Sequence, residues 1–514
     1  MIARLASETF DVLVIGGGAT GLGVAVDASS RGYRTALVEA SDFASSTSSR
    51  STKLIHGGVR YLAQGNIALV REALYERTLL RRNAPHVVSD VPFIVPAYSW
   101  IQLATLNAGL KIYDALAGQS EFGRTRRLTV SETLERIPKL ETRRLRGAIE
   151  YHDGGFDDAR LAITLARTAD DNGTALANYT RAVALLRVND RICGATVEDR
   201  ENAMRFPVQA RVVVNAAGIF ADTVRRLDSA STPAMLRFSR GSHITVAERS
   251  LGSAQSALLI PKTSDGRVLF AVPWHEHVIV GTTDVAVDAA IENPQAEESE
   301  IAFILASVNR YLQSPLDRSE VLASFAGIRP LIARGRSSTS RLSREHVIDV
   351  SSSGLVTIAG GKWTTYRKMA QDAVDRAIDV ARLTAAPCKT ADLPLHGADA
   401  APSADEPLRV YGSDAKDVEA ITHREPQLAA RLHSRLPYTK AQVVYAVREE
   451  MARTVDDILS RRLRATFLDT GAAAECTAVV EKLLGTSARY EKQSDYAADV
   501  DHKNDNRVNP CAQD

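Results

Sequence analysis

The chain has 514 residues, of which 45% are hydrophobic and 24% are charged, so it is long enough for two to four folded domains and too apolar to be disordered. It carries 63 Lys and Arg residues against 62 Asp and Glu residues, and this balance gives no reason to expect a nucleic-acid-binding protein. The four cysteines form no C-x-x-C pair, which argues against a metal site or a disulfide framework and indicates reduced thiols in a cytoplasmic protein.

The first residues of the chain argue against export. Residues 1–10 lack the apolar stretch of a signal peptide, and no apolar run approaches the ~20 residues of a membrane span. We therefore expect a cytoplasmic protein, with attachment to the inner face of the cell membrane left open.

The start of the chain predicts a nucleotide-binding βαβ unit. A buried strand (residues 11–15, DVLVI) leads into GGGATG, and a helix and a second strand ending at Glu39 follow. Gly16 allows the tight turn, Gly18 lets the backbone approach a pyrophosphate, and Gly21 lets the helix pack closely on the strand. The helix N-terminus offers N–H groups to the phosphates, and Glu39 lies where a carboxylate accepts from ribose hydroxyls. The unit alone does not separate FAD from NAD.

The rest of the chain is expected to alternate between segments of helices and buried strands, like the βαβ unit, and segments of antiparallel sheet. Helices are predicted at 67–83, 99–117 and 158–172, strands at 175–179, 182–188 and 211–215, and a break at Pro85, Pro92 and Pro96. Alternating patterns then predict an antiparallel sheet with strands at 243–247, 258–261, 267–274 and 278–281. A strand at 355–358 and a helix after Lys362 again resemble the βαβ unit. A linker, a helical region and a polar tail follow.

Two further motifs favour a flavin. Residues 212–218 (VVVNAAG) read as a strand running into a small-residue turn that ends at Gly218, and no second G-x-G-x-x-G is present for a nicotinamide cofactor. Gly361 and Lys362 begin a helix, and a helix N-terminus with an added lysine can stabilise an anionic reduced flavin.

Several segments resemble the FAD-dependent glycerol-3-phosphate dehydrogenases, in that family's order. These are SSTSSRSTKLIHGGVRYL (45–62), RGSHIT (240–245), GTTD (281–284), FAGIRPL (325–331), GGKWTTYR (360–367) and TVDDILSRRLRATFLD (454–469). The resemblance covers roughly residues 10–470. It implies an α/β fold in which a Rossmann-like FAD domain of the amine-oxidase type is interleaved with an antiparallel-sheet substrate domain and followed by a C-terminal helical domain.

On this basis we place the domains in discontinuous segments. The FAD-binding domain takes residues 1–85, 150–235 and 340–385, the substrate domain 86–149 and 236–339, the helical domain 395–485, and a flexible tail 486–514. The residues expected to bind the cofactor are Gly16, Gly18, Gly21, Glu39, Ser48, Ser49, His56, Gly57, Val183, Gly218, Gly361, Lys362 and Thr364.

The resemblance also implies a substrate site for glycerol 3-phosphate. Arg60 and Arg329 match the family's phosphate-binding arginines, and a guanidinium fork suits phosphate. Tyr61 is expected to add a hydrogen bond to the substrate and Thr283 to hold a substrate hydroxyl.

The reaction that the resemblance implies is transfer of a hydride from C2 to the flavin while the C2 hydroxyl loses a proton. A neutral imidazole is a suitable acceptor for that proton, and His243 is the first candidate. His56 is the second candidate, although we interpret it as a flavin-side residue. Arg329 and Lys362 are expected to stabilise developing negative charge.

The electron acceptor is predicted from the length of one segment. Oxygen-using members of the family carry a long insertion after the IRPL motif, whereas the segment from Leu331 to Gly360 is short here, which favours a membrane quinone. The sequence departs from the family's NATGPW with NAAGIF at 215–220, which touches flavin-side packing. An oxidase using O2, an amine or 2-hydroxy-acid oxidase and a flavin scaffold without turnover remain alternatives, and a homodimer is left open.

The apolar segment 99–117 admits two interpretations. Leu103, Leu106, Leu110 and Tyr113 share one helical face, which could lie in a lipid interface or pack as a core helix.

Overall fold

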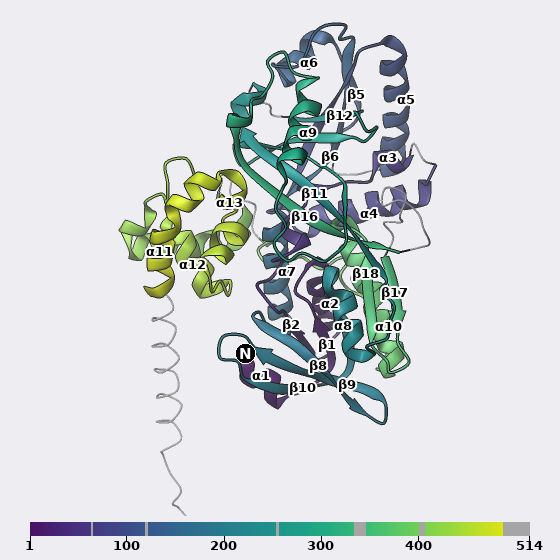
Figure 1. Cartoon of the computed structure of the whole chain (residues 1–514), viewed down its shortest axis with the longest axis vertical. Helices are drawn as coiled ribbons and strands as arrows, with labels where there is room; N and C mark the ends of the chain where they lie inside the picture. The colour runs from purple at the N-terminus through teal and green to yellow at the C-terminus, as the bar shows by residue number, and fades with distance from the viewer. Residues whose placement is uncertain (63–64, 119–121, 253–255, 334–345, 400–406, 487–514) are drawn as a thin grey trace, which may run out of the picture. The chain divides into compact units, whose positions relative to one another are not determined.

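The computed structural model of the chain describes residues 1–62, 65–118, 122–252, 256–333, 346–399 and 407–486, without the side chains of Arg60 and Tyr61 (Figure 1). The chain forms two compact units, Met1–Ser413 and Asp414–Asp514. The second unit therefore begins later than residue 395, where we expected the helical domain to start. The predicted tail, residues 487–514 of which are outside the described range, stays a prediction.

The first unit contains an eight-stranded sheet built around the predicted βαβ unit. Strand β1 (Thr9–Ile15) pairs in parallel with β2 (Thr35–Val38) and β10 (Arg205–Asn215). On either side, β7 (Ala175–Ala177) and β18 (Val356–Gly360) extend the parallel core. The antiparallel strands are β8 (Thr180–Val188), β9 (Arg191–Asp199) and β17 (His346–Val350).

Helices pack beside this sheet and against one another (Figure 1). Helix α2 (Ala19–Ser30) contacts both α7 (Asp158–Asp171) and α10 (Tyr366–Ala381). Helices α2 and α10 approach each other closely at Gly23, where a Cβ atom would lie 2.9 Å from the Tyr366 ring. The remaining helices around the sheet are α1 (Ile2–Ser7) and α8 (Ala221–Asp228).

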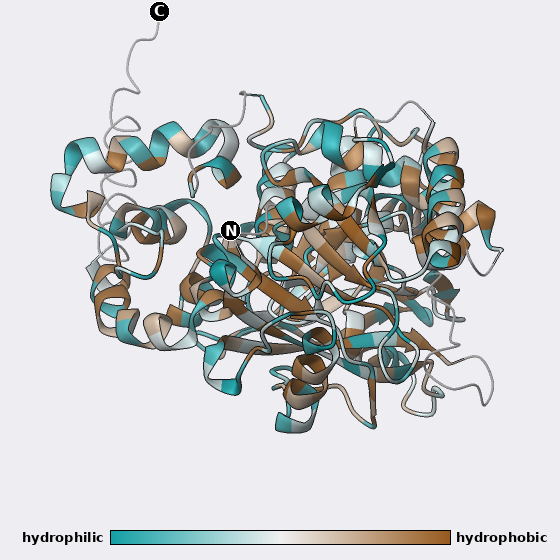
Figure 2. Cartoon of the chain, turned by 90° about the horizontal axis from the view of Figure 1, so that it is seen from above, coloured by the Kyte–Doolittle hydropathy of each residue, from teal (hydrophilic) through white to brown (hydrophobic). Residues whose placement is uncertain are grey.

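A second, ten-stranded sheet belongs to the same unit. Its strands are β3 (Leu54–Ile55), β4 (Val88–Ala97), β5 (Arg126–Leu128), β6 (Gly147–Phe156), β11 (Leu236–Ala247), β12 (Ala257–Ile260), β13 (Leu269–Trp274), β14 (His277–Gly281), β15 (Val285–Val287) and β16 (Val321–Ile332). Most pairs are antiparallel, as predicted, and β12 pairs with β4 in parallel. Apolar side chains line both sheets, and the strands at the centre of Figure 2 are correspondingly brown. This buried apolar surface is the main force that holds the unit together.

Strand β4 corrects one expectation. We expected a break at Pro92 and Pro96, whereas both prolines lie inside a ten-residue strand that pairs with β6 along its length. Proline is tolerated where its missing N–H is not needed by a neighbouring strand. The other neighbour, β12, pairs with β4 only at Phe93 and Ile94, so β12 leaves most of that edge of β4 without backbone pairing.

Helix α5 (Trp100–Ala117) packs on the second sheet. It does so with the apolar face for which the sequence left open a lipid interface or a protein core. Leu103, Leu110 and Tyr113 are buried in a core cluster, whereas Trp100, Ile101 and Ile112 are exposed. The predicted face is therefore a core face. Among the described helices, none has both the length and the hydropathy to cross a membrane.

The other helices of the first unit are α3 (Val59–Leu62), α4 (Ile67–Asn83), α6 (Val130–Arg136) and α9 (Glu298–Asn309). The second unit is helical over its described part, with α11 (Ala415–Arg424), α12 (Lys440–Glu449), a π-helical turn at Asp457–Arg462, α13 (Ala465–Leu468) and a helical stretch at 470–486.

Candidate active site

The glycine-rich turn between β1 and α2 is packed too tightly for side chains. A Cβ at Gly21 would lie 1.8 Å from the Gly16 carbonyl oxygen, and a Cβ at Gly16 would lie 2.6 Å from that of Ala216. Gly16 also has a φ of +115°, a backbone conformation that favours glycine. These contacts hold the N-terminus of α2 directly beside the carboxyl ends of β1 and β10, as the motif predicts.

Two side chains complete the turn. Glu39, at the end of β2, accepts hydrogen bonds from the N–H groups of Gly17 (2.6 Å) and Ser41 (2.9 Å). Burial raises the pKa of the Glu39 carboxyl, and these two N–H groups act in the opposite direction. The Ser48 hydroxyl accepts from the N–H of Ala19 at 2.9 Å.

Two cavities lie beside this turn and share part of their walls. The larger, about 540 Å³, runs from Glu39 past Gly16 and Gly18 to Val183 and Gly218. The smaller, about 270 Å³, is bounded by both sheets. The residues that line both cavities are Ala19, Thr20, Thr47, Ser48, Ala216 and Gly218. Predicted residues in the wall of the smaller cavity are Ser48, His56, Gly218, His243, Arg329, Gly361, Lys362 and Thr364.

His243 reaches the smaller cavity from the middle of the second sheet. It lies on β11 between Gly281 of β14 and Phe325 of β16, and its ring stacks on Phe325 with centroids 4.8 Å apart. A Cβ at Gly281 would lie 2.2 Å from the imidazole, so the glycine of GTTD makes room for this ring. Burial lowers the pKa of His243 well below its usual value, and the charges of Arg329 and Lys53 add to this. The imidazole is therefore neutral at pH 7.

Arg329 reaches the same cavity from β16. Its guanidinium donates to the Thr282 hydroxyl at 2.8 Å and to the Thr283 carbonyl oxygen at 3.2 Å, and Asp284 lies 3.5 Å away. A Cβ at Gly241 would lie 2.1 Å from its Nη2 atom, so the glycine of RGSHIT makes room for the arginine. A rigidly held fork at a cavity wall is suited to an anionic ligand.

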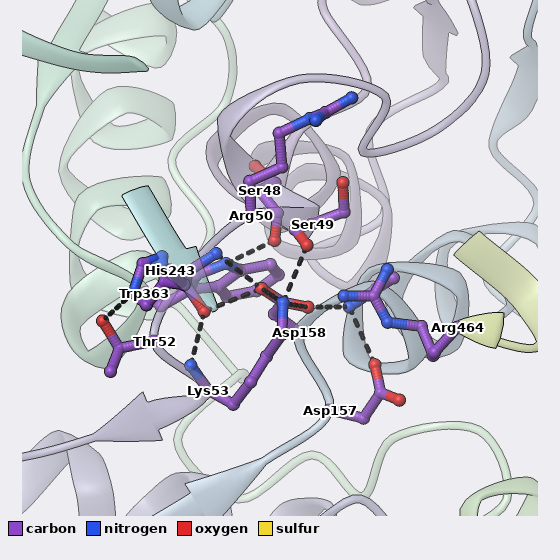
Figure 3. Close-up of polar contacts among 12 residues, drawn as sticks. Ser48, Ser49, Arg50, Thr52, Lys53, Asp157, Asp158, His243, Trp363 and Arg464 are labelled. Carbon is purple, nitrogen blue, oxygen red and sulfur yellow. Dashed lines mark hydrogen bonds and ion pairs between the residues drawn. The ribbon is translucent and has the colours of Figure 1, made fainter. Parts of the chain in front are cut away.

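A buried ion pair between Lys53 and Asp158 lies near His243 (Figure 3). We did not predict this pair. Lys53 is 1% exposed and donates to both carboxylate oxygens of Asp158, at 2.8 and 2.7 Å. Its ammonium lies 5.2 Å from the centre of the Phe325 ring. Thr52, which directly precedes Lys53 in the chain, makes a 2.9 Å hydrogen bond to Nε2 of His243. We call Thr52, Lys53, Asp158, His243 and Phe325 the histidine layer.

Other predicted residues have different surroundings. The Thr283 hydroxyl donates to Glu300 at 2.6 Å and accepts from the Ser242 N–H at 2.8 Å, and Thr283 is not among the lining residues of the cavity. Gly57 is buried under Tyr113 and Leu74, with its N–H 3.4 Å from Asp153.

Ser49 is also outside the cavity walls, and its carbonyl oxygen accepts from Lys53. The Thr364 hydroxyl contacts the backbone of His56, 3.3 Å from its N–H. Arg60 and Tyr61 lie on α3, but their side chains are outside the described part. The roles predicted for these residues stay predictions.

Comparison with known proteins decides the family. The sequence model of the FAD dependent oxidoreductases matches residues 11–367, and that of the C-terminal domain of alpha-glycerophosphate oxidase matches 356–495. The mitochondrial glycerol-3-phosphate dehydrogenase of Mesocricetus auratus is 43% identical over 93% of this chain and 70% of its own length. Glycerol-3-phosphate dehydrogenase 2 of Mycobacterium bovis is 40% identical over 94% of this chain and 86% of its own.

The chain belongs to the family of FAD-dependent glycerol-3-phosphate dehydrogenases. Its fold agrees with this membership, because the structure of the glycerol-3-phosphate dehydrogenase from Bacillus halodurans complexed with FAD superposes with a TM-score of 0.77 at 30% identity, covering 100% of this chain and 98% of the other. The predicted fold class, FAD cofactor and enzyme class are thereby confirmed.

The residues present in this dehydrogenase fit FAD. An elongated dinucleotide needs a backbone cradle for its pyrophosphate, a carboxylate for its ribose and a second compartment for its ring system. The turn at Gly16–Gly21 and Glu39 would supply the first two. The smaller cavity, beside Gly361 and Lys362, would supply the third.

Proposed function

We propose that this dehydrogenase oxidises sn-glycerol 3-phosphate to dihydroxyacetone phosphate and passes the electrons to a membrane quinone. The observation that carries the proposal is the smaller cavity, where the fixed cation of Arg329 and the neutral imidazole of His243 share one wall region with the segment Gly361–Lys362. The names of the two relatives at 43% and 40% identity support the same substrate.

Arg329 binds the substrate phosphate in this proposal. Its side chain is 23% exposed and is held by Thr282 and the Thr283 carbonyl oxygen, so the charge is in place before the substrate arrives. A preorganised guanidinium loses little entropy on binding a phosphate and forms charge-assisted hydrogen bonds to it. Arg60 and Tyr61 are proposed as additional substrate contacts on the strength of the family resemblance. The contact predicted for Thr283 stays a prediction, and it would require the hydroxyl to leave Glu300 and Ser242.

His243 accepts the proton of the C2 hydroxyl. Because its imidazole is neutral at pH 7, it can take up a proton at the time when C2 loses its hydride. Bound FAD supplies the two-electron acceptor for that hydride. Lys362 and Arg329 place positive charge around the reacting region and so lower the cost of developing negative charge.

The exposed face of α5 is the surface that we propose for contact with the membrane. Trp100 is 59% exposed, and the guanidinium groups of Arg127 and Arg146 each lie 5.6 Å from its ring. Aromatic side chains next to arginines suit the headgroup region of an anionic lipid surface. A peripheral location on the inner face of the cell membrane would place the enzyme near a quinone, and a homodimer stays a prediction.

An anaerobic reduction experiment tests the proposal. Glycerol 3-phosphate should bleach the flavin absorbance near ~450 nm of the purified protein, whereas glycerol should not. Slow recovery in air and fast recovery with a soluble quinone are expected. Fast recovery in air would instead indicate an oxidase, and bleaching by amino or 2-hydroxy acids alone would indicate the other substrate class. Flavin that no such compound bleaches would favour a scaffold without turnover.

A further inference from the structure

The hydrogen bonding of His243 leaves it one way to exchange a proton. The side chain is 2% exposed, and Nδ1 has no hydrogen-bond partner within the described part of the chain. Nε2 has one partner, the Thr52 hydroxyl at 2.9 Å. Thr52 is half-buried in the wall of the smaller cavity. The threonine hydroxyl therefore lies where both the cavity and the imidazole are within its reach.

The position of Thr52 is fixed by one carboxylate, which binds the residues on both sides of it in the chain. On one side, Ser51 donates to Asp158 from its N–H at 2.9 Å and from its hydroxyl at 2.7 Å. On the other side, the Lys53 ammonium binds the same carboxylate at 2.7 Å. The Lys53 N–H also donates to the Ser51 hydroxyl at 3.0 Å, which closes a small ring of bonds around Thr52.

The backbone at this point is unusual in a way that agrees with such a clamp. Lys53 has a φ of +63°, in the left-handed region that side chains other than glycine seldom adopt. Such a conformation persists when its surroundings over-determine it, and such positions cluster at active sites. With this turn, Lys53 points to Asp158 and Thr52 points to His243.

We propose that Thr52 is a catalytic residue that relays the substrate proton to His243, and that Asp158 is a positioning residue that holds Thr52 through Ser51 and Lys53. This rests on the proposed function. The C2 O–H bond of the substrate breaks and its proton passes to Oγ of Thr52. The Thr52 O–H bond breaks and its proton passes to Nε2 of His243, which becomes imidazolium. The C2–H electron pair leaves as hydride to the bound FAD, and C2 becomes the ketone carbon.

The relay requires one arrangement of protons in the resting enzyme. Thr52 must donate to Nε2, so the neutral imidazole must carry its proton on Nδ1. This requirement can be checked without turnover, because ¹⁵N shifts of labelled histidine distinguish the two tautomers. His243 is identified among the 11 histidines by the signal that disappears in His243→Asn.

The kinetic test compares Thr52→Val with Thr52→Ser in the FAD-loaded enzyme. Valine keeps the shape but removes the hydroxyl, and loss of a positioned proton-transfer group should slow anaerobic bleaching by glycerol 3-phosphate about 100-fold. Serine should restore the rate to within about 5-fold, because it carries the same hydroxyl. In mixtures of H₂O and D₂O, the wild-type rate should curve with deuterium content, as expected for two protons in motion. Bound FAD and half-saturating substrate should change little in both variants.

Two further variants separate chemistry from folding. Thr133→Val removes a buried hydroxyl bonded to the Thr129 carbonyl oxygen on α6, outside the cavity walls, and should bleach like wild type. Asp158→Asn should slow bleaching by about 10-fold or more through misplacement of Thr52. It should also raise the Nε2–H tautomer of His243 in the ¹⁵N spectrum, which a loss of stability alone would not do.

The outcomes are distinct. A Thr52→Val enzyme that bleaches within about 3-fold of wild type, or a wild-type His243 that carries its proton on Nε2, overturns the relay and leaves the substrate assignment standing. A wild-type enzyme that glycerol 3-phosphate does not bleach overturns the proposed function and the relay with it. Slow bleaching in Thr52→Val with rescue by serine and the Nδ1–H tautomer supports the relay.

Discussion

The pyrophosphate cradle and the histidine layer sit next to each other but are built in opposite ways. The cradle proposed for the pyrophosphate uses consecutive residues, Gly16–Gly21, whose close packing requires the absence of Cβ atoms and which would bind through backbone N–H groups. The histidine layer brings together residues 52, 53, 158, 243 and 325, and acts through side chains on different elements. The first needs one turn and the adjoining end of β10 at Ala216, whereas the second exists only after several strands of the second sheet and α7 have packed.

The largest effect that separates the two regions is expected in the cradle. Gly21→Val should abolish FAD binding, because even the first added carbon would lie 1.8 Å from the Gly16 carbonyl oxygen and the backbone must move. The ratio of flavin to protein after purification measures the result. Gly109→Ala, where a Cβ meets nothing within 4 Å, is the matched control and should keep its FAD. A yellow Gly21→Val protein would show that the turn can relax.

The next effect belongs to the histidine layer. Lys53→Met should lower the free energy of unfolding by about 3–5 kcal/mol, because it removes the buried ammonium that pairs with the Asp158 carboxylate. Urea unfolding followed by flavin release measures this. The double variant Lys53→Met/Asp158→Asn should recover part of the loss, since the carboxylate charge that Lys53 neutralises is removed together with it.

An exposed ion pair provides the comparison for Lys53. Arg82 and Asp392 are 49% and 83% exposed, and Arg82→Met should change the free energy of unfolding by about 0.5 kcal/mol or less. Equal effects of Lys53→Met and Arg82→Met would mean that the Lys53 pair is solvated, and the distinction between the two regions would fail.

A third effect concerns binding of substrate. Arg329→Ala should weaken the apparent affinity for glycerol 3-phosphate by about 2–4 kcal/mol, as expected for loss of a charge-assisted phosphate contact. FAD should stay bound, because the cradle lies on the other sheet. Initial rates of bleaching against substrate concentration give the value, and Arg318→Ala, at an exposed pair with Glu298, should behave as wild type. Unchanged half-saturation in Arg329→Ala would remove Arg329 from the phosphate site.

The same contrast explains what the sequence could predict. The βαβ unit is visible because strand, glycines, helix and Glu39 follow one another at fixed spacing. His243 and Arg329 were found through the family resemblance, and the reason that Gly241 and Gly281 accompany them became visible only in the sheet register, where each glycine makes room for a side chain.

The pairing of Lys53 with Asp158 could not be predicted. The two residues lie 105 positions apart, and neither has a pattern of its own that points to the other. Strand β4 was missed for a related reason, since the sequence does not show that its neighbour β12 pairs with it only at Phe93 and Ile94 and leaves most of that edge unpaired. In both cases the decisive information is a tertiary neighbour.

The smallest expected effect compares two histidines of the second sheet. Burial alone would lower the pKa of His152 on β6, but Asp90 and Glu150 outweigh it and raise the pKa to about 9. Its folded value is therefore above its unfolded value of about 6.5. The stability that it contributes is fully present below pH ~6.5 and is lost as the pH rises through ~9. His243 has the opposite sign, because its lowered pKa makes stability fall as the pH drops below ~6.5.

Urea unfolding at several pH values tests the His152 contribution. Between pH ~6 and ~10, wild type should lose about 1–2 kcal/mol more than His152→Gln, a value below the full shift because solvent screens a partly exposed pair. Asp90 accepts from His152 at 3.0 Å, so Asp90→Asn should remove part of the same dependence. If wild type and His152→Gln lose stability in parallel, the carboxylates do not hold the proton on His152. Carboxylates surround His152, whereas His243 in the same sheet is buried near the cations of Arg329 and Lys53. If the carboxylates do not act on His152, the opposite signs of the two pKa shifts are left without their cause.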